Sequence, residues 1–101
     1  MSEKSKNLSA QIDETLIWVE SEIDKTVHGL ESEAMDSGDH LKFIRSRLLG
    51  IKSCLTQNNG RRDPDFSPDI ARLVIDTWPV GHPIGRQLCR IEYEYERLKP
   101  I

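Results

Sequence analysis

The feature that most constrains the fold of this chain is the spacing of its apolar residues. In the first third of the sequence they recur every three or four positions, at Leu8, Ile12, Leu16, Val19, Ile23, Val27, Leu30 and Ala34. This is the period of one helix face, whereas a half-buried strand alternates every second residue. The run contains no proline. It predicts a long helix that begins near Ser9 and ends near Met35, before a turn at 36–38.

A second segment has the same spacing over a shorter run. Asp39 has the chemistry of a helix N-cap, and the segment ends at the polar sequence 57–60. Its apolar positions are Leu41, Ile44, Leu48, Ile51 and Leu55. Because only a short turn separates the two helices, we expect a long antiparallel helical hairpin over about 9–57.

Two prolines mark the starts of two shorter helices, expected over about 68–78 and 83–99. The first has an apolar face of Ile70, Leu73, Val74 and Thr77, and the second has one of Ile84, Leu88, Ile91, Tyr95 and Leu98. No segment alternates like a strand. A chain of 101 residues has room for one core. The predicted fold is therefore an all-α helical bundle that forms a single domain over 1–101, with 1–8 flexible and 58–67 as a loop.

Charge is divided along the chain. Residues 1–36 hold nine acidic residues against three lysines, whereas residues 40–62 hold six basic residues and no acidic one. Opposite charges favour pairing of the two long helices, although each exposed ion pair contributes only about 0–1 kcal/mol. The alternative is a basic strip that contacts an acidic partner or a phosphate backbone. Its candidate residues are Arg45, Arg47, Lys52, Arg61 and Arg62, of which the last two lie beyond the helix.

Two apolar side chains lie off the stripe of the first helix. Trp18 is almost opposite the stripe, and Ile17 lies beside it. Trp18 either packs beneath a shorter helix or serves as an aromatic anchor for a partner. The first helix is also expected to extend about 13 Å beyond the second at its amino-terminal end. This surplus of apolar surface predicts a homodimer through Ile17 and Trp18.

The last helix has a second pattern opposite its apolar face. Three guanidinium groups and one aromatic ring recur every three or four residues, at Arg86, Arg90, Tyr93 and Arg97. Such a stripe can bind phosphates or stack on a base. Three glutamates flank it, and Arg90 and Glu94 have the spacing of a helical ion pair. A solvated helix face is therefore the other interpretation.

Motifs for metal binding and catalysis are weak. An alternation of oxygen ligands resembles the start of a calcium loop, at Asp63, Asp65, Ser67 and Asp69. However, Pro68 occupies the position that needs glycine, and Val74 the position that needs glutamate. The three histidines lack the spacing of a zinc site. His82 and Cys89 are two helical turns apart, about 10 Å, which is too far for a base and its nucleophile.

The sequence therefore predicts a non-catalytic protein with no metal and no cofactor, which acts by binding another protein as an adaptor, inhibitor, chaperone or regulator. The alternative is a nucleic-acid-associated regulator that uses the basic residues, although a net charge of −3 does not favour it. The polar start lacks the apolar core of a secretory signal, and no run is apolar enough to cross a membrane. The two cysteines lack CxxC spacing, so we expect reduced thiols and a cytoplasmic protein.

Overall fold

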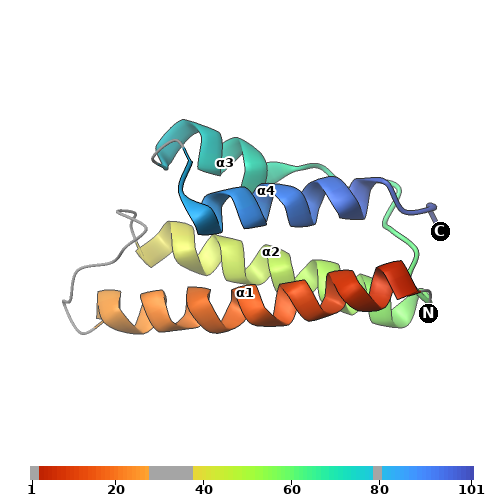
Figure 1. The fold of residues 1–101 in the computed structure, drawn as a ribbon, viewed down its shortest axis with the longest axis horizontal. Helices are drawn as coiled ribbons and strands as arrows, with labels where there is room; N and C mark the ends of the chain where they lie inside the picture. Colours follow the sequence, from red (N-terminus) through yellow and green to blue (C-terminus); the bar gives the residue numbers. More distant parts are fainter. Residues whose placement is uncertain (1–2, 28–37, 79–80) are drawn as a thin grey trace.

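The computed structural model describes residues 3–27, 38–78 and 81–101. The described residues form four helices and no strand: α1 (Glu3–Val27), α2 (Gly38–Gln57), α3 (Asp69–Thr77) and α4 (Pro83–Glu96). The predicted all-α fold class is thus confirmed. Figure 1 shows α1 and α2 side by side in opposite directions, with α4 along them and α3 outermost. None of the described helices has the length and hydropathy that crossing a membrane requires.

The apolar stripes meet in one core. All five apolar positions of α2 are buried, as are those of α1 from Leu8 to Ile23 and those of α4 from Leu88 to Tyr95, together with Leu98 just after α4. The face of α3 differs from the prediction at one position. Thr77 is exposed and its hydroxyl donates to the Leu73 carbonyl at 2.7 Å, whereas Trp78, the next residue, is buried. Trp78, just after α3, therefore occupies the buried position that was predicted for Thr77.

The amino-terminal end of α1 differs from the prediction. The helix begins at Glu3 rather than near Ser9. The Ser5 hydroxyl donates to the Gly60 carbonyl at 3.2 Å, and the Lys4 ammonium lies 3.9 Å from the Glu94 carboxylate. The structure thus places residues 3–8 in α1, ahead of the predicted start of the helix. The predicted end of the helix near Met35, and the positions 27–37 of its stripe and closing turn, lie outside the residues whose side chains are described.

The carboxyl-terminal end of the chain is pinned by the loop before α3. α4 ends at Glu96 rather than near 99, and the chain then turns toward Arg62. The Arg62 amide donates to the Lys99 carbonyl at 3.0 Å, and the Arg62 carbonyl accepts from the Ile101 amide at 3.0 Å. The Arg62 Nε also donates to the Leu98 carbonyl at 3.0 Å. One of the two loop arginines that favoured a basic strip therefore has a structural role.

Candidate functional site

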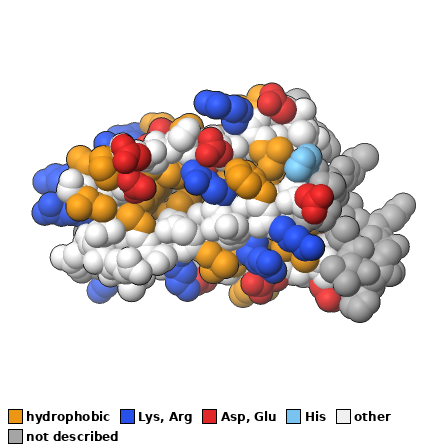
Figure 2. All heavy atoms as spheres, turned by 180° about the vertical axis from the view of Figure 1, so that it is seen from behind, with side chains coloured by type: hydrophobic (Ala, Val, Ile, Leu, Met, Phe, Trp, Pro, Cys, Tyr) orange, Lys and Arg blue, Asp and Glu red, His pale blue; other side chains and the backbone are white. Residues whose placement is uncertain are grey.

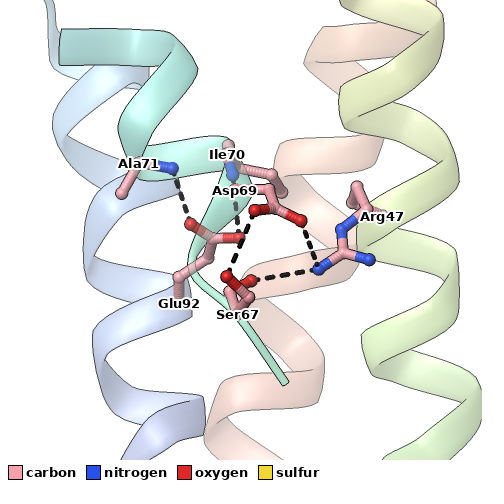
Figure 3. A network of polar contacts seen from close by, with 6 residues as sticks. All are labelled: Arg47, Ser67, Asp69, Ile70, Ala71 and Glu92. Carbon is pink, nitrogen blue, oxygen red and sulfur yellow. Dashed lines mark hydrogen bonds and ion pairs between the residues drawn. The ribbon is translucent and has the colours of Figure 1, made fainter. Parts of the chain in front are cut away.

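The start of α3 is capped by a side chain of α4. Glu92 is fully buried, and its carboxylate accepts hydrogen bonds from the amides of Ile70 at 3.0 Å and Ala71 at 2.6 Å (Figure 3). The first amides of a helix have no acceptor within the helix itself. The residue at the local cap position, Pro68, supplies no side-chain acceptor. Glu92 thus supplies, from another helix, the acceptor that the local cap position lacks.

A second contact ties the start of α3 to α2. The Arg47 guanidinium donates to the Ser67 carbonyl at 3.0 Å and lies 3.3 Å from the Asp69 carboxylate (Figure 3). The Ser67 hydroxyl also donates to Asp69 at 3.2 Å. Burial raises the pKa of the Glu92 carboxyl, an effect that its two amide donors and the nearby Arg47 charge partly offset. These polar contacts fix where α3 lies on the bundle.

The start of α4 is shaped by His82 and Gly85. The His82 Nδ1 atom accepts from the amides of Ile84 at 3.2 Å and Gly85 at 3.4 Å, so the ring caps the helix that Pro83 opens as predicted. A Cβ atom at Gly85 would lie 3.1 Å from both the Trp78 ring and the Val74 side chain. Glycine therefore allows α3 and α4 to approach closely at this point.

Three rings form an aromatic cluster under this junction. The Trp78 ring lies 6.0 Å from the Trp18 ring and 5.2 Å from the His82 ring, and Trp18 and His82 are also 6.0 Å apart. Each pair is tilted or edge-to-face, which is the favourable geometry for aromatic contacts. Of the two interpretations of Trp18, the structure supports packing within its own chain.

Above this cluster lies a groove between α3 and α4, called the α3–α4 groove below. It encloses about 410 Å³ and is lined by Val74, Ile75, Trp78, Gly81, His82, Gly85, Arg86 and Cys89. Ile75 is 77% exposed at its edge, the largest exposure of the large apolar side chains described. Concave apolar surface with a few polar groups is typical of binding sites.

Two residues of the groove, Cys89 and His82, do not form an activated nucleophile–base pair. Burial, with a smaller contribution from the Glu92 charge, raises the pKa of the Cys89 thiol. A thiol becomes a nucleophile as its thiolate, and catalytic sites lower its pKa. The acceptor nitrogen of His82 is occupied by two backbone amides. The two residues line one groove, but neither is activated by the other.

A second cavity, of about 320 Å³, lies between α2 and the loop before α3, where Arg47, Asp69 and Tyr95 are among its lining residues. The Tyr95 hydroxyl accepts from the Asp63 amide at 2.8 Å, and burial together with a hydrogen bond to Cys54 raises the pKa of Tyr95 to about 12. Arg47 and Asp69 pair with each other. The polar groups of this cavity therefore hold the loop in place.

Several residues of the predicted basic strip make contacts within the chain. Lys52 pairs with Asp13 of α1, as complementary charge on the two long helices predicts, and Arg47 and Arg62 bind the loop and the chain end. Arg45 is half-buried and Arg61 is exposed. Three of these five side chains are therefore engaged within the chain, and the basic strip stays a prediction.

The four residues of the stripe on α4 are exposed, but the ion pairing beside them differs from the prediction. Arg86, Arg90, Tyr93 and Arg97 are all exposed. The predicted pair of Arg90 with Glu94 is wrong, because Glu94 pairs with Lys4 of α1 instead. The Arg97 guanidinium donates to the Tyr93 hydroxyl at 2.8 Å and lies 5.4 Å from its ring centre.

The predicted dimer surface is divided by the structure. Ile17 is 72% exposed, whereas Trp18 belongs to the aromatic cluster. On the face shown in Figure 2, hydrophobic side chains form small groups separated by charged ones. Single exposed apolar residues are common on monomers. The homodimer stays a prediction, but Trp18 no longer supports it.

The sequence did not predict the roles of several residues in and around the groove. Trp78 and Ile75 lie off the face assigned to the third helix, and Glu92 was placed on a solvated flank. A signal existed for His82, since the residue before a proline at the first helical position is the cap position.

Within 3–27, 38–78 and 81–101, no three acidic, histidine or cysteine side chains form a group that could hold a metal. A comparison of the chain with protein-family models, curated proteins and solved structures finds no match.

Proposed function

We propose that this chain is a non-catalytic cytoplasmic protein that acts by binding another protein, and that the α3–α4 groove receives an apolar side chain of that partner. The observation that carries the proposal is the groove itself, with Ile75 exposed at 77% beside a depression of about 410 Å³. An aromatic or aliphatic anchor in such a pocket supplies most of the binding energy of many interfaces.

The construction of the groove supports the proposal. Its walls are fixed before any partner arrives, because Glu92 caps α3 and His82 caps α4. A preformed site avoids the cost of ordering its own residues on binding. The Trp78 ring, which lines the groove, also packs on the Trp18 and His82 rings.

A matched pair of isoleucines tests the proposal. Ile75 and Ile17 are 77% and 72% exposed, but only Ile75 lines the groove. Twelve-residue peptides displayed on phage are selected on the wild-type protein, and binding of the enriched peptides is then measured on Ile75→Glu and Ile17→Glu. We expect Ile75→Glu to abolish binding and Ile17→Glu to leave it unchanged. Equal binding to all three proteins would contradict the proposal.

The same variants test self-association. Light scattering of the wild type at tens of micromolar gives the mass of the species in solution, and the predicted homodimer requires that Ile17→Glu lower it to the monomer mass. A monomeric wild type would remove the homodimer, and a dimer broken only by Ile75→Glu would make the groove a self-association site.

A further inference from the structure

We infer that the partner of the α3–α4 groove is an acidic segment, with one large apolar side chain in the groove and carboxylates on Arg86 and Arg90 of α4. This inference rests on the proposed function and names the chemistry of the occupant. It depends on two observations, namely where the arginines lie relative to the groove and what they pair with.

The first observation is position. Arg86 lines the groove together with Gly85 and Cys89. Arg90 lies one helical turn further along the same face, about 6 Å away along the axis. Both side chains are exposed. A partner that fills the groove and continues along α4 therefore meets Arg86 first and Arg90 next.

The second observation is charge. Among the described residues, no acidic side chain forms an ion pair with Arg86 or Arg90, and Glu94, four residues after Arg90, pairs with Lys4. The surface where α1 approaches Arg90 consists of Lys4, Asn7, Leu8 and Gln11, with Glu94 of α4. None of the α1 residues there is acidic. The two guanidinium groups therefore keep their charge and their hydrogen-bond donors available to a partner.

Guanidinium groups select for planar anions. Arg binds a carboxylate through two parallel N–H donors, and such contacts steer a partner and fix its register. Carboxylates spaced three or four residues apart on a helical partner match the spacing of Arg86 and Arg90. Phosphates have similar chemistry, but the apolar groove beside the arginines favours a peptide that carries both kinds of side chain.

Peptide selection tests this composition directly. Twelve-residue peptides selected on the wild type are expected to share one Leu, Phe or Trp and at least two Asp or Glu. One enriched peptide and its Glu→Gln version are then titrated against the protein. We expect Arg86→Glu/Arg90→Glu to weaken binding of the acidic peptide at least about tenfold, which is about 1.4 kcal/mol. A Glu→Lys peptide should bind this double variant better than it binds the wild type.

A control variant distinguishes the effect of the two arginines from the effect of the net charge of the protein. Lys6→Glu/Lys42→Glu changes the net charge by the same amount at two exposed positions outside the groove lining, and it should leave the dissociation constant within about twofold. All four substituted positions are exposed, so circular dichroism should show the same helix content in every variant.

The outcomes distinguish the two proposals. If Ile75→Glu abolishes binding but the arginine reversals do not, the groove binds peptides and the acidic partner is wrong. If Ile75→Glu has no effect, the proposed function fails. A 15-nucleotide single-stranded DNA is the probe for phosphate binding. Saturable binding to it that Arg86→Glu/Arg90→Glu removes would overturn the acidic partner in favour of a nucleic acid.

Discussion

The two helix pairs of this bundle are held by different means. α1 and α2 meet through apolar side chains that recur every three or four residues, and Leu41, Ile44, Leu48 and Leu55 are fully buried between helices. α3 and α4 also bury apolar side chains, among them Ile70, Val74 and Leu88, but their packing depends in addition on the Glu92 and His82 caps and on the close approach at Gly85. A periodic seam spreads its stabilisation over many positions, whereas a capped junction places it on few. The larger of the two cavities described above also lies at this junction.

The largest effect on the free energy of unfolding is expected at the interface between α1 and α2. Leu48→Ala removes a fully buried side chain from α2 and should lower the free energy of unfolding by about 2–5 kcal/mol, because it leaves a cavity. Leu49→Ala, one residue further and 46% exposed, is the control and should change it by less than about 0.5 kcal/mol. Urea denaturation measures both. Equal effects would mean that the seam does not lie where we place it.

The next effect is expected at the cap of α3. Glu92→Leu leaves the amides of Ile70 and Ala71 without their acceptor and should cost about 1–3 kcal/mol in the free energy of unfolding. In the variant, hydrogen exchange of these two amides should become faster than in the wild type, by more than that of amides in α2. Unchanged exchange would contradict the role of Glu92 as a cap from another helix.

The same residue predicts a pH dependence. Because burial raises the pKa of Glu92, the folded protein holds this proton more tightly than the unfolded chain does. The associated stability is present below the ordinary glutamate pKa of about 4.3 and is lost as the pH rises through the raised value. Glu92→Gln has no such proton. The stability of this variant relative to the wild type should therefore increase between pH 4 and pH 7, and a decrease would mean that the carboxylate's hydrogen bonds outweigh its desolvation.

A smaller effect is expected at the cap of α4. His82→Ala removes the acceptor for the amides of Ile84 and Gly85 and should cost about 0.5–2 kcal/mol. His82→Asn keeps a short acceptor that favours the cap position, so it should recover most of the loss. Thermal unfolding compares the two, and equal losses would show that the ring acts by packing on Trp18 and Trp78 instead.

The smallest effect is expected from charge between α1 and α2. Lys52→Glu places like charges at the contact with Asp13 and should lower the free energy of unfolding by about 0–1 kcal/mol, less at high salt. The swap Asp13→Lys/Lys52→Glu should restore it. A large loss that the swap does not restore would assign Lys52 another role.

The α1–α2 interface and the α3–α4 junction also differ in how much of their structure the sequence predicts. Periodicity located the buried positions of α2 and α4, because a helix face is a local property of the chain. It could not find the partner of Trp18, since Trp78 and His82 come from another part of the sequence. Glu92 was missed for the same reason. A glutamate that caps a distant helix has the same sequence pattern as one in solvent, and its burial follows only from the packing of α3 on α4.

The groove could not be predicted because it depends on this packing. Ile75 is a single apolar residue off the helix face, and Gly85 is a glycine in the first turn of α4. Only their proximity to Trp78 and Cys89 makes them parts of one site. The sequence predicted a stripe on α4 and its three arginines are exposed, but the ion pair of Glu94 with Lys4 of α1 depends on helix packing that the sequence pattern does not contain.

The two tryptophans offer the most direct test of the groove as a binding site. Trp18 and Trp78 are the only tryptophans of the chain; Trp78 lines the groove and Trp18 packs beneath it. In a two-dimensional nitrogen–proton NMR spectrum they give two indole signals. On titration with a selected acidic peptide, we predict that the Trp78 indole and the amides of Ile75, Gly85 and Arg86 shift in step with occupancy, while that of Leu49 stays in place. Shifts confined to the outer faces of α1 and α2, with both indole signals unmoved, would contradict this account.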